Sequence, residues 1–232
     1  MVLMTASSTN IKCHKILTNG NRPTLFELKS IPISRVVECL SHFGSVELPT
    51  AEAAFIWQSI VRHFKGVANI PDSVLMTLHW ITPAISVSEY AKLTLGDIDV
   101  VRNFGFDYNL SNEQLLAIAD RVRVHFAGKS PEDYTCFDLT ALGTILCAFN
   151  GSEIQRIHAS AYKEASEFIG QLKCGPEVMS SFAKLAAKPE AFGPPVNWSD
   201  DTIRVIGNVA KYLPKVAVDK SVARIGKNWT TE

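Results

Sequence analysis

Val101–Leu139, VRNFGFDYNLSNEQLLAIADRVRVHFAGKSPEDYTCFDL, contains the clearest helix signals in this sequence of 232 residues. Its segment Ser111-Asn112-Glu113-Gln114 has the spacing of a capping box, in which Ser and Gln each bond to the other's backbone N–H. The spacing predicts a helix over 115–126. Gly128 is expected to end it, because glycine adopts the left-handed conformation common after a helix.

A second helix start follows at Ser130-Pro131-Glu132-Asp133. Serine caps helices, proline fits their first turn, and acidic side chains are favoured near the positive end of the helix dipole. This pattern predicts a helix that holds Asp138 and continues toward Phe149.

Two charged residues of the same stretch stand among apolar neighbours. Arg102 lies between Val101 and Phe104, and Asp138 lies between Phe137 and Leu139. A lone charge in an apolar environment is costly unless it has a partner, a ligand or water. We therefore expect Arg102 and Asp138 to meet across the fold, either as a structural pair or at a ligand.

Helical spacing of apolar residues extends outward in both directions from this stretch. The predicted segments cover approximately 33–43, 50–64, 88–95, 153–172, 176–187 and 202–213. No internal repeat is recognised. The sequence predicts an all-α fold with about eight to ten helices.

The domain organisation follows from where this spacing is absent. Residues 1–32 and 214–232 are expected to form extended N- and C-terminal arms around a helical core of residues 33–213. The net charge is zero, but residues 1–30 carry four basic and one acidic residue, and residues 202–231 carry six and one. Residues 31–201 carry thirteen basic and twenty acidic residues. Basic arms on an acidic body suggest contact with a polyanion or a neighbouring copy, and solvated termini are the alternative.

The cysteine pattern and the apolar segments indicate the compartment. The five cysteines are odd in number and have no CxxC spacing, so we expect neither a zinc site nor a disulfide framework, and a reducing compartment. We expect no signal peptide, no membrane span and no membrane partner. Several N-glycosylation sequons, including those at Asn150 and Asn197, are accordingly interpreted as chance matches.

Motifs for catalysis are missing. The sequence has no phosphate-binding glycine loop, zinc-protease motif or nucleophile elbow. Cys39 and His42 lie one helical turn apart, a spacing that chance readily produces. His158 is interpreted as a packing or hydrogen-bonded residue. We expect a protein that is not an enzyme and has no cofactor and no metal.

Basic residues at predicted helix ends suggest a binding surface. Cations are favoured there by the helix dipole alone, which is one interpretation. The other is sequence-independent contact with the phosphates of a nucleic acid. The candidate residues are Arg62, Lys65, Arg121, Arg123 and Lys129.

The segment VRNF, followed 36 positions later by the Asp of PEDYTCFDL, resembles a pattern in the coat proteins of flexuous filamentous plant RNA viruses. The potexvirus-like group is most similar, and the resemblance extends over about 34–172. It departs from the family where Leu139 replaces an aromatic residue. The resemblance implies that Arg102, Asp138 and Ser73 line an RNA-binding pocket, in which a guanidinium bridges phosphate and carboxylate.

The leading hypothesis is a viral coat protein that polymerises helically around single-stranded RNA and links its own copies through the arms. Its location would be the virion and the host cytoplasm. Two alternatives stay open: a nucleocapsid protein of a segmented negative-strand RNA virus, and a cellular α-helical adaptor that binds protein partners.

Overall fold

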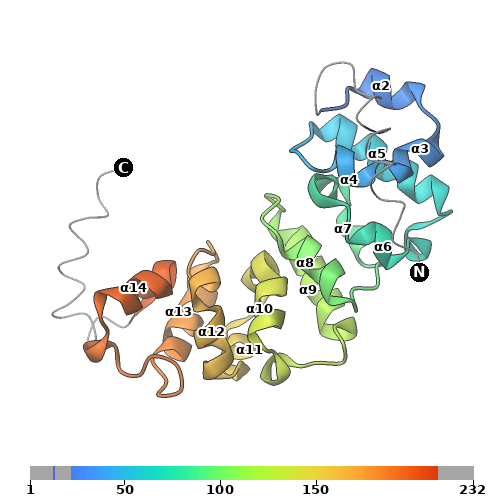
Figure 1. The fold of residues 1–232 in the computed structure, drawn as a ribbon. Helices are drawn as coiled ribbons and strands as arrows, with labels where there is room; N and C mark the ends of the chain where they lie inside the picture. Colours follow the sequence, from blue (N-terminus) through green and yellow to red (C-terminus); the bar gives the residue numbers. More distant parts are fainter. Residues whose placement is uncertain (1–12, 14–21, 214–232) are drawn as a thin grey trace, which may run out of the picture. The chain divides into compact units, whose positions relative to one another are not determined.

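The computed structural model of the chain describes Cys13 and residues 22–213 (Figure 1). Residues 22–213 form thirteen α-helices and six 3-10 helices, and no strand occurs within this range. The predicted all-α class is confirmed, with more and shorter helices than expected. None of the helices in this range is both long enough and apolar enough to cross a membrane.

The described residues divide into two compact units between Phe126 and Ala127. Each unit buries its own apolar core, and we describe each by itself. The predicted boundaries of the core, at residues 33 and 213, remain predictions. The C-terminal arm, residues 214–232, lies outside the described residues. The prediction of an extended N-terminal arm is wrong at Leu25–Ser30. These residues form a helix that begins with a capping box between Thr24 and Glu27.

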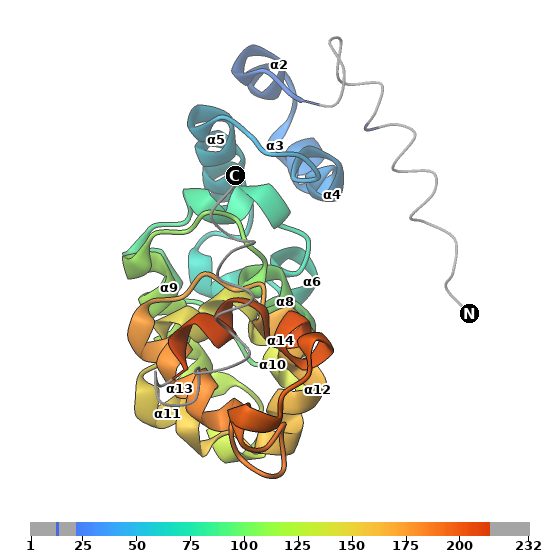
Figure 2. The same cartoon turned by 90° about the vertical axis from the view of Figure 1, so that its left-hand side faces the viewer.

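Unit 1 is built around its longest early helix, α5. This helix packs against α2, α3 and the 3-10 helix η2, and its Ile56, Trp57 and Ile60 are buried. Figures 1 and 2 show α3 and α5 at one end of the unit. The elements are α2 (Leu25–Ser30), α3 (Ile33–Glu38), α4 (Leu40–Phe43), α5 (Thr50–His63), η1 (Val67–Asn69), α6 (Asp72–Leu75), η2 (His79–Ala84), α7 (Val87–Tyr90), α8 (Ile98–Gly105) and α9 (Asn112–His125).

Unit 2 is built around α12, which contacts both α10 and α14 (Figure 1). The buried ring of Tyr162 in α12 stacks on Phe182 of α13, with 5.7 Å between ring centroids. The elements are η3 (Pro131–Asp133), α10 (Cys136–Leu142), η4 (Gly143–Ala148), α11 (Gly151–Arg156), α12 (Ala159–Ile169), α13 (Pro176–Ala186), η5 (Pro195–Asn197), α14 (Asp200–Ile206) and η6 (Gly207–Tyr212).

Helix ends account for the extra helices. The capping box Ser111–Gln114 is confirmed at the start of α9. The helix predicted from Ser130 to Phe149 is wrong: Ser130 caps only η3, and α10 begins anew after a second capping residue, Thr135. The helix predicted over 153–172 is divided at Ile157, because that residue adopts an extended conformation between α11 and α12.

The structure contains a repeat that the sequence analysis does not recognise. The six-residue 3-10 helices η2, η4 and η6 begin at residues 79, 143 and 207, which are 64 residues apart. Each follows an α-helix and begins with a residue of positive φ: His79 (47°), Gly143 (50°) and Gly207 (58°). The following helices α7 and α11 start from capping boxes at Ser86 and Asn150, again 64 residues apart.

The repeat extends through further elements. The helices α9 and α13 have their N-caps at Ser111 and Gly175, and η1, η3 and η5 begin at residues 67, 131 and 195. The chain is therefore a tandem helical repeat with a period of 64 residues in this part.

Candidate binding site

The predicted Arg102–Asp138 pair is not what the structure shows. Arg102, in α8, donates a hydrogen bond to Asp99 one turn earlier, and both side chains are about half exposed. Such a surface pair contributes little to stability, about 0–1 kcal/mol. Arg102 therefore has a partner within its own helix. Its side chain reaches solvent and is not enclosed by the apolar residues that flank it in the sequence.

Asp138 is buried and pairs with Lys129. The Lys129 ammonium donates to both carboxylate oxygens at 2.8 Å, and the backbone N–H and hydroxyl of Thr135 donate to Oδ2, also at 2.8 Å. Burial alone would raise the pKa of Asp138, but these hydrogen bonds hold the pKa below its usual value. The carboxylate thus closes the capping box of α10, a structural role that satisfies its charge.

The other predicted residues are distributed over surface helix ends. Ser73, Arg62 and Lys65 are exposed in unit 1. Arg121 donates its Nε–H to the carbonyl oxygen of Leu93 at 2.8 Å, and Arg123 pairs with Asp120 at 2.7 Å. Of the eight predicted residues, Lys129 and Asp138 are joined by a hydrogen bond.

Two disulfides link cysteines that lie far apart in the sequence. Cys13 bonds to Cys39 in unit 1, and Cys147 bonds to Cys174 in unit 2. The prediction that no disulfide framework exists is wrong. Its basis was spacing, whereas pairing depends on which cysteines the packed helices bring together. Cys136 is the odd, free cysteine, and a hydrogen bond with Glu164 raises the pKa of its thiol.

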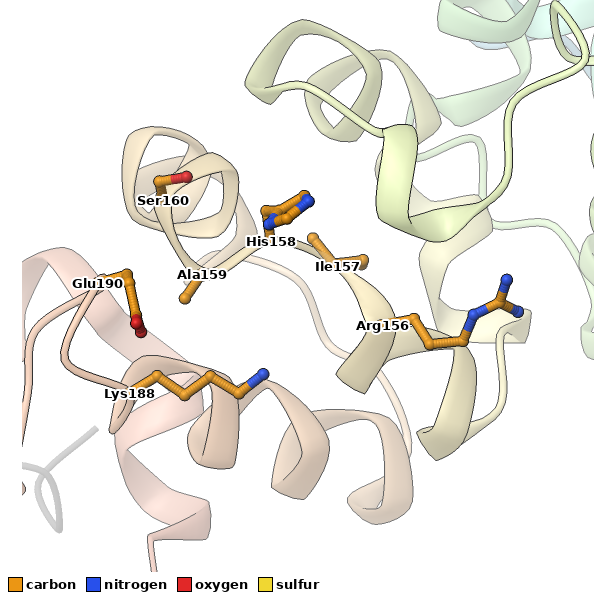
Figure 3. Close-up of a pocket in the computed structure, with 7 residues that line it drawn as sticks. All are labelled: Arg156, Ile157, His158, Ala159, Ser160, Lys188 and Glu190. Carbon is orange, nitrogen blue, oxygen red and sulfur yellow. The ribbon is translucent and has the colours of Figure 1, made fainter.

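A polar recess of about 390 Å³ lies in unit 2, where α11 meets α12 and the turn after α13 (Figure 3). The break between α11 and α12 at Ile157 positions this recess. Ile157 and Ala159 are buried and form its apolar part. The polar side chains around it are those of Arg156, His158, Ser160, Lys188 and Glu190, all exposed.

The charged side chains around the recess differ in whether they have a partner among the described residues. The guanidinium of Arg156 points away from Lys188 in Figure 3 and pairs with Glu132 at 2.6 Å. Within the described residues, the side chains of His158, Ser160, Lys188 and Glu190 form no hydrogen bond and no ion pair. The recess offers an ammonium, an imidazole and a hydroxyl as donors and one carboxylate as acceptor. It is therefore suited to one or two polar side chains of a partner.

Sequence reasoning missed most of this recess. Lys188, Glu190 and Ser160 carry no motif, and 28 residues separate Ser160 from Lys188. His158 was interpreted as a packing or hydrogen-bonded residue, but its side chain is exposed and has no such bond among the described residues. The break between α11 and α12 at Ile157-His158, which positions the recess, could have indicated it. The sequence analysis did not detect this break, because the helical spacing of apolar residues continues through it. No group of three metal-ligating side chains occurs among the residues that the structure describes.

These features define a class: a tandem α-helical repeat protein with disulfides within the chain and a polar recess on its surface. No protein-family model matches the sequence. The chain is similar to stereocilin of human, 30% identical over 202 residues that cover 83% of this chain and 11% of that protein. Mouse stereocilin is 28% identical over the same shares, and mouse otoancorin is 30% identical over 141 residues, 61% of this chain and 12% of that protein. The chain thus spans about a tenth of the length of these relatives.

These relatives overturn the viral interpretation. They are cellular proteins of mouse and human, so the coat-protein hypothesis is wrong, and so is its nucleocapsid alternative. Three further predictions are therefore wrong as well: the single-stranded RNA partner, the helical homopolymer, and the location in a virion or host cytoplasm. The resemblance centred on an Arg and an Asp 36 residues apart and was extended over about 34–172. The cellular adaptor alternative agrees better with these relatives.

Proposed function

We propose that the chain is a non-enzymatic, α-helical protein-interaction module of a cellular protein, and that it folds in an oxidising compartment. The observation that carries the compartment is the pair of disulfides, one in each unit. Disulfides form and persist in secreted and extracellular proteins and are rare where thiols are kept reduced. The similarity to cellular animal proteins supports this interpretation and opposes a viral role.

The recess between α11, α12 and the turn after α13 is the proposed contact surface. Its donors, Lys188, His158 and Ser160, favour an acidic side chain on the partner, because charge-assisted hydrogen bonds to carboxylates are among the stronger polar contacts. Tandem helical repeats commonly present extended binding surfaces, and this supports a protein partner over a small substrate.

The compartment is tested by producing the full chain in animal cells with an added signal peptide, and by mapping disulfides in the secreted protein. Peptides that contain Cys13 bonded to Cys39 and Cys147 bonded to Cys174 are expected, with Cys136 labelled as a free thiol. A secreted, folded protein with all five cysteines labelled would contradict the proposal.

The contact surface is tested by proximity labelling on the cell exterior with a biotin ligase fused to the secreted chain. Lys188→Glu places a negative charge against an acidic partner. Proteins that are biotinylated by the unchanged chain are therefore expected to be absent from the set biotinylated by this variant. Lys184→Glu, an exposed lysine of α13 outside the recess, is the matched control and should retain the labelling. Equal labelling by the two variants would exclude the recess as the contact.

A further inference from the structure

We propose that Asn109 is an attachment site for an N-linked glycan. The inference rests on the proposed function, because this modification requires entry into the secretory pathway, where disulfides also form. Asn109-Leu110-Ser111 is a sequon, a pattern that acts as an acceptor only on an accessible surface segment. Disulfides in both units remove the reason for interpreting such sequons as chance matches.

The loop between α8 and α9 holds Asn109 outward. Its neighbour Tyr108 is buried, at 4% exposure, and packs edge-on against Trp80 with 5.2 Å between ring centroids. The Tyr108 hydroxyl donates to Asn103 Oδ1 at 3.3 Å, which fixes the loop to the core of unit 1. Asn109 follows this anchor with φ of 57° and is exposed.

The Asn109 side chain is chemically available. Its backbone N–H donates to Asp107 Oδ1 at 3.3 Å. Its amide group forms no hydrogen bond within the described residues. A glycan on Nδ2 would therefore displace no contact, and asparagine is among the residues that tolerate this left-handed backbone.

Asn150-Gly151-Ser152 provides the contrast. Asn150 Oδ1 accepts hydrogen bonds from Glu153 N at 2.9 Å and from Ser152 Oγ at 2.6 Å, so the side-chain amide of Asn150, unlike that of Asn109, is held at a helix start. Gly151 is buried against α13, and a Cβ there would lie 2.7 Å from Ser181 Oγ. A glycan on Asn150 would have to be accommodated beside this packed contact, so we expect Asn150 to remain unmodified.

The test uses the full chain with an added signal peptide, secreted from animal cells, in two variants that each keep one sequon. The sequence has three further sequons, at Asn150, Asn197 and Asn228-Trp229-Thr230. Ser152→Ala, Asn197→Gln and Thr230→Ala together remove these three and leave Asn109. In the second variant Asn109→Asp, which tolerates positive φ, replaces Ser152→Ala and leaves Asn150. Intact mass before and after glycosidase treatment should show one glycan on the first variant and none on the second.

The outcomes separate this inference from the proposed function. A secreted chain with both disulfides formed but no glycan on the Asn109 variant would overturn the inference and leave the proposed function standing. A glycan on the Asn150 variant and none on the Asn109 variant would overturn it too. A chain that enters the pathway without forming either disulfide would contradict the proposed function itself.

Discussion

The 3-10 helices η2 in unit 1 and η6 in unit 2 have the same backbone start but different side chains. Gly207 begins η6 at φ 58°, and a Cβ there would lie 2.5 Å from the carbonyl oxygen of Gly170. His79 begins η2 at φ 47°, and its N–H donates to the buried amide of Asn103 at 3.0 Å. Close backbone packing therefore requires glycine in unit 2, whereas hydrogen bonds hold a larger residue in the same conformation in unit 1.

The largest expected effect is that of Gly207→Ala in unit 2. The new Cβ would collide with backbone of Gly170 and would sit on a left-handed residue, so the free energy of unfolding should fall by about 3–4 kcal/mol. Urea unfolding followed by tryptophan fluorescence, to which Trp198 of unit 2 contributes, measures this. Gly193→Ala is the control, because its φ is 70° but, among the described residues other than its chain neighbours, no atom lies within 4 Å of the added Cβ. A loss of about 1 kcal/mol is expected there, and equal losses would refute the packing argument.

Asn103→Ala tests the corresponding support in unit 1. The Asn103 amide accepts from His79 N and donates to the carbonyl oxygen of Leu75, both at 3.0 Å. Its removal takes away the partner of the part-buried His79 N–H and leaves the buried Leu75 carbonyl with a longer bond of 3.4 Å from Leu78 N. The free energy of unfolding should fall by about 2–3 kcal/mol. Urea unfolding followed by tryptophan fluorescence measures the change, since unit 1 contains Trp57 and Trp80. Asn69→Ala removes an exposed, longer hydrogen bond of 3.4 Å and should leave stability within about 0.5 kcal/mol.

Asp138→Asn tests the charge that closes the capping box of α10. The pKa of Asp138 is lowered in the folded state, so its contribution is present above the unfolded pKa of about 3.9 and is lost as pH falls through the folded pKa. We expect Asp138→Asn to cost about 1–2 kcal/mol at pH 7 and progressively less as the pH falls below about 3.9. Chemical unfolding over this pH range measures the difference.

Asp201 provides a matched carboxylate for that comparison. It pairs with Arg204 at 2.8 Å, but both side chains are largely exposed. Asp201→Asn should therefore change stability by no more than about 0.5 kcal/mol at any pH. If the two substitutions gave the same pH profile, burial would not be the reason for the role of Asp138.

The smallest expected effect separates His79→Gly from His79→Ala. Glycine adopts positive φ without cost, whereas alanine does not, so the glycine variant should be more stable than the alanine variant by about 1 kcal/mol. Both variants lose the 3.3 Å contact between His79 Nδ1 and the Tyr108 hydroxyl, so this contact cancels in the comparison. Two variants of equal stability would show that the left-handed start of η2 is not maintained in solution.

The sequence by itself determined the fold class and one complete helix start. The capping box Ser111–Gln114 is local, because the residues that satisfy each other's backbone lie three positions apart, and α9 begins there. The apolar spacing also placed α5 and α13 within a residue or two. These features depend on neighbours in the chain, and a sequence records them directly.

The 64-residue repeat was weakly encoded. Pairs such as Leu75 and Leu139, Leu78 and Leu142, and Glu89 and Glu153 keep identity across it, but they mark only buried or capping positions. The surface between them varies freely. The first residue of the 3-10 helix is not kept either. Histidine at position 79 and glycine at position 143 both adopt a positive φ.

Only the tertiary structure decided the disulfide partners, the recess and the fate of the two isolated charges. Cys147 bonds to Cys174, and Ser160 and Lys188 line the same recess, because α11, α12 and α13 pack together although they are separated in the sequence. Arg102 and Asp138 were expected to pair with each other, yet Arg102 pairs with Asp99 and Asp138 pairs with Lys129. Apolar and capping patterns fix where helices form, but which side chains meet depends on how those helices pack, and that information is distributed over the whole core.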